Sequence, residues 1–142
     1  MDTKFMEYAI KFATKSKCEV PVGAVVVKQG KVISYAHNTN TKTKISTNHA
    51  EVIAINKACK KLKTNKLVGC DIYITKEPCL MCMGAIINSR IENVYFGCYD
   101  LRFEVVNKLS NFTFNHNVNI VGGIMEAECA KILSNFFKTL RG

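Results

Sequence analysis

The spacing of apolar residues along the chain predicts alternating helices and strands. Apolar residues recur three and four positions apart over residues 2–16, which indicates an amphipathic first helix. An almost uninterrupted apolar run follows at 20–27 and a second at 31–36, with Gln29 and Gly30 between them. Two short apolar runs joined by a glycine-containing turn predict a β-hairpin whose first strand is buried.

The pattern continues through the rest of the chain. A polar loop rich in Asn, Thr and Lys covers about 38–47, and Asn48, a residue type that caps helices, predicts the start of a second helix. The further predicted elements are strands at 71–75, 93–97 and 118–121, a helix from Pro78 to Asn88, and a closing helix at 126–140. Strands alternating with helices after a hairpin predict an α/β fold, with a mixed five-stranded sheet covered by helices on both faces. No repeat or boundary is visible, so residues 1–142 are expected to form one domain.

Composition is that of an ordinary globular protein. The chain has 142 residues, of which 48% are hydrophobic and 22% are charged. No stretch approaches the roughly 20 apolar residues that a membrane-spanning helix needs. The N-terminus leads directly into the first amphipathic pattern, so we expect no secretory signal. These features predict a cytoplasmic protein with no membrane partner.

Seven cysteines raise the question of disulfide bonds. The number is odd and no secretory signal accompanies it, so a disulfide framework is not indicated. Two of the seven belong to a Cys-x-x-Cys motif, and the others stand among apolar residues: Cys18, Cys59, Cys70, Cys98 and Cys129. We expect these five to be reduced and buried, in a reducing compartment.

The net charge of +9 is unevenly distributed. Residues 1–69 carry 13 lysines against four acids, whereas residues 70–142 carry seven basic and seven acidic residues. A solvated lysine-rich helix face explains this excess, and so does a surface that binds a polyanion such as RNA. Charge alone does not separate the two explanations.

Two short motifs carry the chemistry of the chain: His49-Ala50-Glu51 and Pro78-Cys79-Leu80-Met81-Cys82. Together they offer three metal ligands, His49, Cys79 and Cys82. A structural zinc site uses four protein ligands, whereas a catalytic site uses three and leaves one position for water. Glu51 beside that position would serve as the general acid and base.

Each motif alone has a simpler explanation. A Cys-x-x-Cys pair is often half of a structural zinc site or a redox pair, and a lone His-x-Glu carries little information. No second Cys-x-x-Cys is present to complete a four-cysteine site, and neither His37 nor His116 has a ligand-like partner nearby. The combination therefore predicts an open zinc centre that activates water, an arrangement typical of zinc-dependent nucleobase deaminases.

Residues spread over almost the whole chain resemble the bacterial tRNA-specific adenosine deaminases, within the cytidine deaminase-like superfamily. Besides the two motifs, the matching segments are Pro21-Val22-Gly23-Ala24, Asn38, Gly84-Ala85, Ser89-Arg90-Ile91, Phe96-Gly97, Asn115-His116, Gly123-Ile124, Glu128-Cys129 and 133–138. The resemblance implies a three-layer α/β/α sandwich, one zinc ion per subunit and a homodimer. It also implies the substrate, which is the wobble adenosine (A34) in the anticodon stem-loop of the arginine tRNA. The enzyme would convert this adenosine to inosine.

The resemblance implies site residues as well. His49, Cys79 and Cys82 would hold zinc and Glu51 would move protons. The residues implied to contact the flipped purine or to line its pocket are Asn38, Val22 and the backbone of Ala50. Those implied to lie near the flanking nucleotides are Asp100, Asn115, His116, Phe136, Phe137 and Lys138.

Segment 101–107 departs from the Lys-, Gly- and Ser-rich stretch that usually follows Asp100 in this family, and the interval to Asn115 is a few residues shorter. Two alternative functions are compatible with the motifs. One is a deaminase of free nucleobases or nucleosides of the guanine or cytosine type. The other, a zinc-stabilised RNA-binding protein without catalysis, is disfavoured because a structural site has no use for Glu51.

Overall fold

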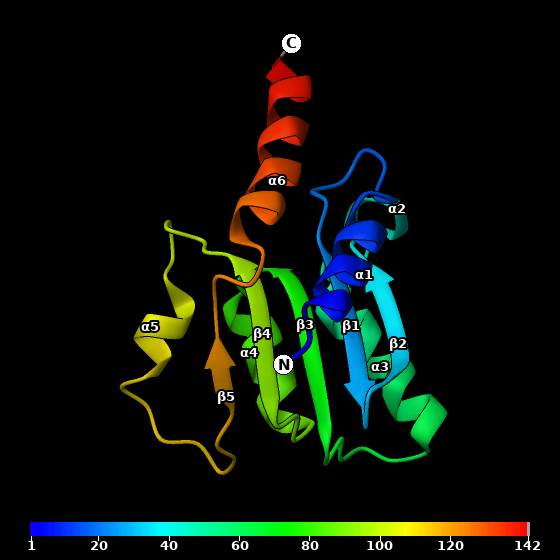
Figure 1. Cartoon of the computed structure of the whole chain (residues 1–142), viewed down its shortest axis with the longest axis vertical. Coiled ribbons are helices and arrows are strands. Elements are labelled where there is room, and N and C mark those ends of the chain that lie inside the picture. Colours follow the sequence, from blue (N-terminus) through cyan, green and yellow to red (C-terminus); the bar gives the residue numbers. More distant parts are fainter. Residues whose placement is uncertain (142) are drawn as a thin grey trace.

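A five-stranded mixed sheet forms the centre of the computed structural model, which describes residues 1–141 (Figure 1). The strands are β1 (Gly23–Lys28), β2 (Lys31–His37), β3 (Cys70–Lys76), β4 (Asn93–Cys98) and β5 (Asn119–Val121), in the order β2-β1-β3-β4-β5. Strand β1 runs antiparallel to both β2 and β3, while β3, β4 and β5 are parallel. The predicted mixed sheet is confirmed.

Helices cover both faces of this sheet. On one face α3 (Ala50–Leu62) and α4 (Leu80–Asn88) pack against β1, β3 and β4. On the other face lie α1 (Thr3–Ala13) and the first half of α6 (Glu126–Arg141), whose second half extends beyond the sheet (Figure 1). Two short helices, α2 (Asn40–Thr43) and α5 (Val105–Leu109), lie in connections. The result is the three-layer α/β/α arrangement that the resemblance implied.

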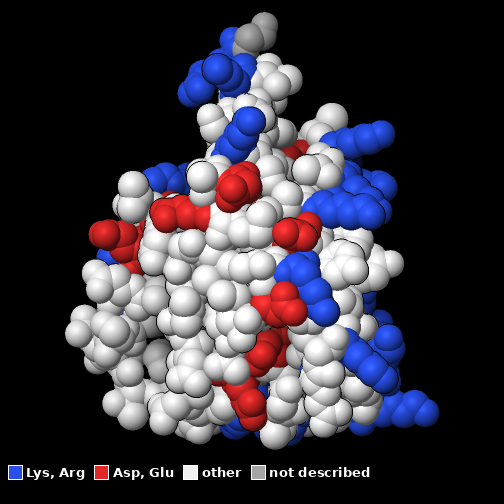
Figure 2. Space-filling view, viewed as in Figure 1, with Lys and Arg blue, Asp and Glu red and all other residues white. Residues whose placement is uncertain are grey.

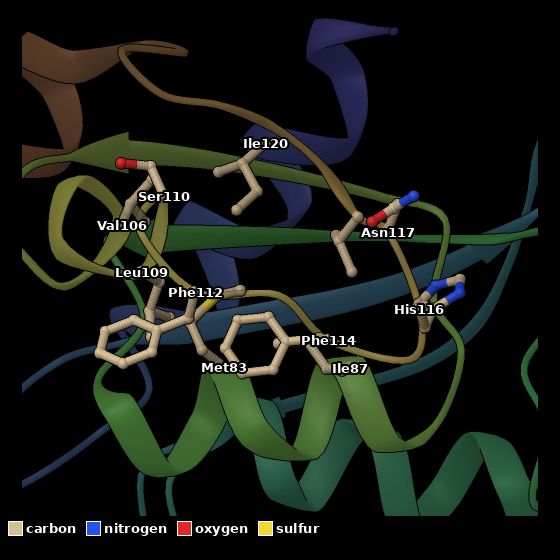
Figure 3. A pocket seen from close by; sticks show the side chains of 11 residues that line it. Met83, Ile87, Val106, Leu109, Ser110, Phe112, Phe114, His116, Asn117 and Ile120 are labelled. Atoms are coloured by element: carbon tan, nitrogen blue, oxygen red, sulfur yellow. The ribbon is translucent and has the colours of Figure 1, made fainter.

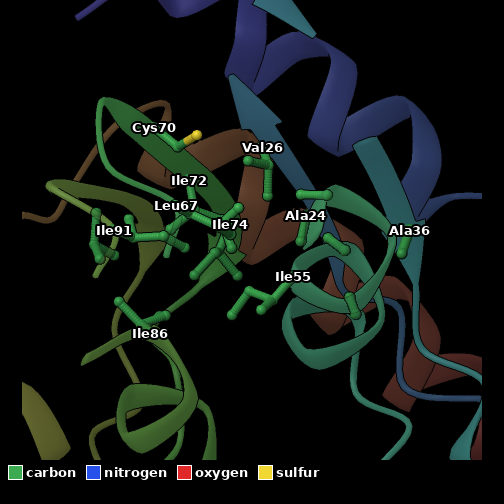
Figure 4. Packing of buried hydrophobic residues seen from close by; sticks show 14 of the residues in the cluster. Ala24, Val26, Ala36, Ile55, Leu67, Cys70, Ile72, Ile74, Ile86 and Ile91 are labelled. Carbon is green, nitrogen blue, oxygen red and sulfur yellow. The ribbon is translucent and has the colours of Figure 1, made fainter. Parts of the chain in front are cut away.

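Successive residues of the central strands pack into two different hydrophobic cores, one on each face of the sheet. Val26 of β1 and Ile72 of β3 face α3 and α4, where they pack with Ile55 and Ile86 (Figure 4). Val25, the neighbour of Val26, belongs to the core under α1. Because these strands are buried on both faces, their sequences are continuous apolar runs rather than alternating ones.

The β1–β2 hairpin has the predicted turn. Gln29 and Gly30 both have positive φ angles, 50° and 74°, which is the backbone of a type I′ turn. The backbone of this turn matches the right-handed twist of the two strands, so two residues are enough to connect them. The other predicted elements begin and end within three residues of those in the structure.

Two helix starts differ from the prediction. Helix α3 begins at Ala50 with His49 as its N-cap, so Asn48 is not the cap; its side-chain amide donates instead to Thr43 Oγ1 at 3.0 Å. Helix α4 begins at Leu80 with Cys79 as its N-cap, so Pro78 precedes the cap rather than occupying the first helical position. In both helices a predicted metal ligand occupies the cap position.

Helices α2 and α5 were not predicted. Elements of four and five residues are too short to show a helical period. Each is held by a buried carboxylate that lies far away in the sequence: Glu19, 22 residues before Thr41 of α2, and Glu77, 29 residues before Val106 of α5. Such contacts leave no local sign in the sequence.

The cysteines follow the prediction with one exception. All seven are free. Cys70, Cys98 and Cys129 are buried, and Cys59 is half-buried. Cys18 is exposed, and the expectation that it is buried was wrong because it lies in the turn after α1 with a φ angle of 61°. No helix within residues 1–141 is long and apolar enough to cross a membrane.

Gly23 allows α1 to lie directly on the sheet, and its replacement tests this packing. A Cβ at Gly23 would overlap the carbonyl oxygen of Ala9 and lie 2.8 Å from the backbone nitrogen of Ala13. Both are backbone atoms, so α1 would have to move. We expect Gly23→Ala to lower the free energy of unfolding by about 2–4 kcal/mol, measured by urea denaturation.

Gly84 provides the matched control for this substitution. It lies within α4, and no atom lies within 4 Å of the position that a Cβ would take. Because alanine favours a helix over glycine, Gly84→Ala should raise the free energy of unfolding by up to about 1 kcal/mol. Similar losses in both variants would contradict the close approach of α1.

Candidate metal centre and active site

The starts of α3 and α4 bring the three predicted metal ligands together. His49 and Cys79 are the N-cap residues of these helices, and both have extended backbones. Neither side chain makes the usual hydrogen bond to the helix N-terminus, so both remain available as ligands. Cys82 is buried in the first turn of α4. The cluster of His49, Cys79 and Cys82 predicted from the sequence is therefore present in the structure.

The distances within this cluster fit zinc. The Nδ1 atom of His49 lies 3.7 Å from Cys79 Sγ and 3.6 Å from Cys82 Sγ, and all three donor atoms lie within 4.8 Å of one another. Bonds of about 2.0 Å to nitrogen and about 2.3 Å to sulfur, at a tetrahedral angle, place the two ligand atoms about 3.6 Å apart. One imidazole with two thiolates is also a donor set that zinc prefers. The residues present thus fit one zinc ion per chain.

Protonation of the cluster favours a thiolate. The pKa of Cys79 is lowered to about 4, chiefly because the Cys82 thiol donates a hydrogen bond to it, with a further contribution from His49. The same hydrogen bond and burial raise the pKa of Cys82. The pKa of His49 is raised, mainly by its hydrogen bond with Cys79. A cation bound here would displace the protons that the three side chains otherwise share.

Glu51 lies beside the cluster. It is buried, with 4% of its surface exposed, and lines a cavity of about 220 Å³ together with His49 and Cys79. Two residues separated by two positions within a helix would point about 200° apart. His49 precedes the helix and is free of this constraint, so both side chains reach the same cavity. Burial raises the pKa of the Glu51 carboxyl.

Asn38, which also lines this cavity, is hydrogen-bonded to the start of α3. Its Oδ1 accepts from the backbone N–H of Ala50 at 2.8 Å, and its Nδ2 donates to the carbonyl of Val20 at 2.9 Å. The N–H of Ala50 requires an acceptor, and the carbonyl of Val20 requires a donor. These two partners therefore determine which end of the Asn38 side-chain amide is the oxygen and which is the nitrogen. One amide hydrogen and one oxygen lone pair are left for a ligand. Asn38 and Val22 both line the cavity, whereas the N–H of Ala50 is engaged by Asn38.

Asp100 lies at the same cavity with two cations around it. Its carboxylate is 3.2 Å from Lys76 Nζ and 3.0 Å from Arg102 Nη2. Hydrogen bonds from Arg102 and then from Lys76 hold the pKa of Asp100 well below its usual range. Lys76 also lines the cavity, so this wall carries one carboxylate between two cations.

The other residues implied by the resemblance lie outside this cavity. Asn115 is exposed, and His116 donates from Nε2 to the carbonyl of Ile91 at 2.7 Å. His116 lines a second cavity of about 280 Å³, between α4 and β5 (Figure 3). Phe136, Phe137 and Lys138 lie on α6. Their contacts with substrate stay predictions.

The histidines outside the cluster have other partners. The ring of His37 lies 3.2 Å from Ser16 Oγ and 3.1 Å from the carbonyl of Asn38. Among the described residues, neither His37 nor His116 belongs to a group that could hold a metal.

Two buried carboxylates beside the cavity were not predicted as site residues. Glu19 and Glu77 are 4% and 5% exposed, and each accepts hydrogen bonds from two backbone N–H groups of a segment next to the cavity. The only signal was position, because Glu19 stands shortly before the buried strand β1 and Glu77 directly after the buried strand β3. That signal does not reveal the distant partners.

On the face shown in Figure 2, many of the basic side chains lie along one flank. Figure 2 shows Lys and Arg side chains along the side where α1 and β2 lie and near the free end of α6. Acidic side chains lie below the protruding part of α6, down the middle of the face and toward its left edge (Figure 2). The charge is therefore distributed asymmetrically over the viewed face, as the sequence indicated.

Known proteins share this fold and these motifs. A sequence model of the MafB19-like deaminase family matches residues 2–141. The tRNA-specific adenosine deaminases of Bacillus subtilis (strain 168) and Aquifex aeolicus (strain VF5) are each 44% identical to this chain. The alignments cover 99% and 96% of this chain and 91% and 94% of the relatives.

A solved structure agrees with the sequence comparison. It comes from studies of A-to-I editing by tRNA:A34 deaminases at the wobble position of transfer RNA, and it superimposes with a TM-score of 0.88 at 38% sequence identity. The match covers 93% of this chain and 100% of that chain. The metal cluster, the acid beside it and these likenesses lead to one conclusion: the chain belongs to the MafB19-like deaminase family and, within it, to the tRNA-specific adenosine deaminases.

Proposed function

We propose that this protein deaminates adenosine to inosine by hydrolysis at the wobble position, A34, of a tRNA anticodon loop, that of the arginine tRNA, in the cytoplasm. The observation that carries the proposal is the meeting of His49, Cys79, Cys82 and Glu51 at one small cavity in a chain of this family. The reaction consumes one water molecule and releases ammonia.

The residues around the cavity have separate tasks in this reaction. His49, Cys79 and Cys82 would hold zinc, which would supply an activated water molecule near neutral pH. Glu51 would take one proton from the attacking water and pass it to the ring nitrogen, and would then pass a second proton, from the hydroxyl group added to the purine carbon, to the amine that leaves as ammonia. Its burial keeps competing water away from this transfer. Asn38 offers its remaining amide hydrogen and lone pair to the purine, and Val22 packs against it.

The RNA outside the cavity meets more exposed residues. Bases of an anticodon loop are unpaired, so extrusion of A34 costs little, and its neighbours are available for stacking. Phe137, which is 42% exposed on α6, offers a stacking surface, and Lys138 next to it offers a cation for phosphate. Phe136, Asn115, His116 and Asp100 complete the proposed set of contacts.

One assay tests the proposed function against its alternatives. The purified, zinc-loaded protein is incubated with an anticodon stem-loop bearing A34, with free adenosine, with guanine and with cytosine. Inosine is quantified by mass spectrometry and ammonia by a coupled assay. Turnover of a free base but not of the stem-loop would sink the tRNA proposal, and tight RNA binding without turnover of any substrate would favour the non-catalytic alternative.

We also infer that the protein acts as a homodimer, as the resemblance implies. Large apolar side chains remain exposed around a hollow of about 550 Å³ between the start of α4 and the segment that follows α5: Leu80, Phe112 and Phe114. An exposed apolar surface of this kind is typical of a protein interface. Cys79 lines the same hollow, so a second subunit bound here would shield the metal centre from solvent.

Charge placed in this hollow should separate the subunits. Phe112 is 66% exposed, so Phe112→Glu should leave the fold intact, but it would place a carboxylate among the apolar side chains of the dimer interface. We expect light scattering after size exclusion to change from a dimer to a monomer. Val68→Glu is the control, because Val68 is 59% exposed and lies at the opposite end of β3 from the site. A dimer that persists in Phe112→Glu would contradict this interface.

A further inference from the structure

Glu77 connects the metal-binding helix to a distant segment of the chain. Its backbone N–H donates to the carbonyl of Cys98 at 2.8 Å, which fixes Glu77 to the end of β4. Its side chain is buried, and one carboxylate oxygen accepts from the backbone N–H of Asp100 at 2.9 Å. The other oxygen accepts from the backbone N–H of Val106, also at 2.9 Å. One carboxylate therefore holds both ends of the segment 100–106.

This segment begins at the active-site cavity, and its residues Phe103 and Val105 line the neighbouring hollow beside Cys79. Asp100 lines the cavity itself. Between the two held ends, Arg102 and Phe103 face solvent, with 70% of the Arg102 side chain and 54% of Phe103 exposed. The guanidinium of Arg102 lies 5.1 Å from the centroid of the Phe103 ring. A stacked arginine and aromatic ring form a surface on which an unpaired base can stack.

We infer that Glu77 is a positioning residue that fixes segment 100–106 as an RNA-binding wall of the active site, and so determines affinity for the anticodon loop rather than the rate of the chemical step. This inference rests on the proposed function for its substrate. Glu77 makes no contact with the reacting base in this role. It acts through the backbone of Asp100 and Val106, and thereby determines where Arg102 and Phe103 lie.

A carboxylate is required here because the two donors lie in different parts of the segment. An ionised carboxylate presents two oxygens, each of which can accept from a separate N–H group. Glutamine keeps one acceptor and presents an amide N–H to the other donor, so one end of the segment is released. Aspartate keeps both acceptors but is shorter by one methylene, so it reaches the two donors less well.

Limited proteolysis measures the release of the segment without any substrate. Trypsin cleaves after Arg102, and mass spectrometry identifies the 102/103 cut among the other sites. Because a hydrogen bond to a charged acceptor stabilises by about 1.5–3 kcal/mol, Glu77→Gln should accelerate this cut at least about tenfold. The rate of this cut in Glu77→Asp should lie between the rates in the unaltered protein and in Glu77→Gln. The aspartate variant also serves as the test if the glutamine variant does not fold. Glu19→Gln is the matched control, since Glu19 holds the backbone of Thr41 and Lys42 in a different segment.

Kinetics with the anticodon stem-loop complete the test. We expect Glu77→Gln to raise KM about tenfold, to keep kcat within about twofold of the unaltered enzyme, and to bind the same amount of zinc. A wild-type rate of the 102/103 cut, a fall in kcat without a change in KM, or loss of zinc would each overturn the inference. If the unaltered enzyme does not act on the stem-loop, the proposed function fails, while the proteolysis still decides whether Glu77 holds the segment.

Discussion

Replacing Glu51 with glutamine should lower kcat on the anticodon stem-loop at least about 10³-fold while leaving the metal centre and RNA binding intact. The substitution keeps the shape of a side chain that is only 4% exposed, so packing around it changes little. It removes the group that takes a proton from water and returns it to the purine. No other carboxylate is placed to replace it, because those of Glu77 and Asp100 are engaged by backbone N–H groups and by cations.

Three measurements make this prediction specific to proton transfer. Single-turnover kinetics report the chemical step, atomic emission reports zinc per chain, and fluorescence anisotropy with a labelled stem-loop reports RNA affinity. In Glu51→Gln only the single-turnover rate should change, while zinc content and RNA affinity stay the same. Glu51→Ala should give the same three results. A near-normal rate in either variant would refute the assigned role, and a parallel loss of zinc would mean that Glu51 supports the metal rather than the reaction.

Cys79→Ala should abolish both metal binding and turnover. Removing one of three protein ligands from a tetrahedral site leaves two, which is too few to hold zinc against solution chelators. The expected zinc content falls from about one ion per chain to nearly none, and turnover falls with it to background. Atomic emission after dialysis and the stem-loop assay measure the two effects on one sample, and circular dichroism reports whether α4 still forms.

Cys59→Ala is the matched control for the loss of a ligand. Cys59 is a free thiol inside α3 and does not belong to the metal cluster, and alanine favours the helix. This variant should keep its zinc and its activity. For the unaltered protein, chelation should remove activity and added zinc should restore it. Retention of zinc in Cys79→Ala would contradict the ligand set.

The metal centre was predictable from sequence because its residues lie within short motifs. His49 and Glu51 share one motif, and Cys79 and Cys82 share another. The chemistry of zinc then determined that both motifs meet at one ion. The central strands were equally predictable, since burial on both faces leaves continuous apolar runs such as 20–27.

The parts that were not predictable depend on distant contacts. Asn48 is a good cap by residue type, but the helix starts two residues later because His49 takes the cap position and Asn38 supplies the acceptor for Ala50. Helix α5 forms where the Glu77 carboxylate accepts a hydrogen bond from the backbone N–H of Val106, which lies 29 residues further along the chain. The local sequence pattern indicates which secondary structures a segment favours. In these segments, contacts with distant residues determine which of those structures forms.

The cap positions of α3 and α4 link protein abundance to zinc supply. Most helices have a Ser, Thr, Asp or Asn side chain there, and its loss costs about 1 kcal/mol per helix. This chain places His49 and Cys79 at these caps without that hydrogen bond, so a zinc ion held by both side chains would join the two helix starts. By mass action, any ion that binds only the folded chain raises the folded fraction. In a zinc-starved cell, the expected first effect is therefore faster degradation of the enzyme, in addition to slower editing by the molecules that remain.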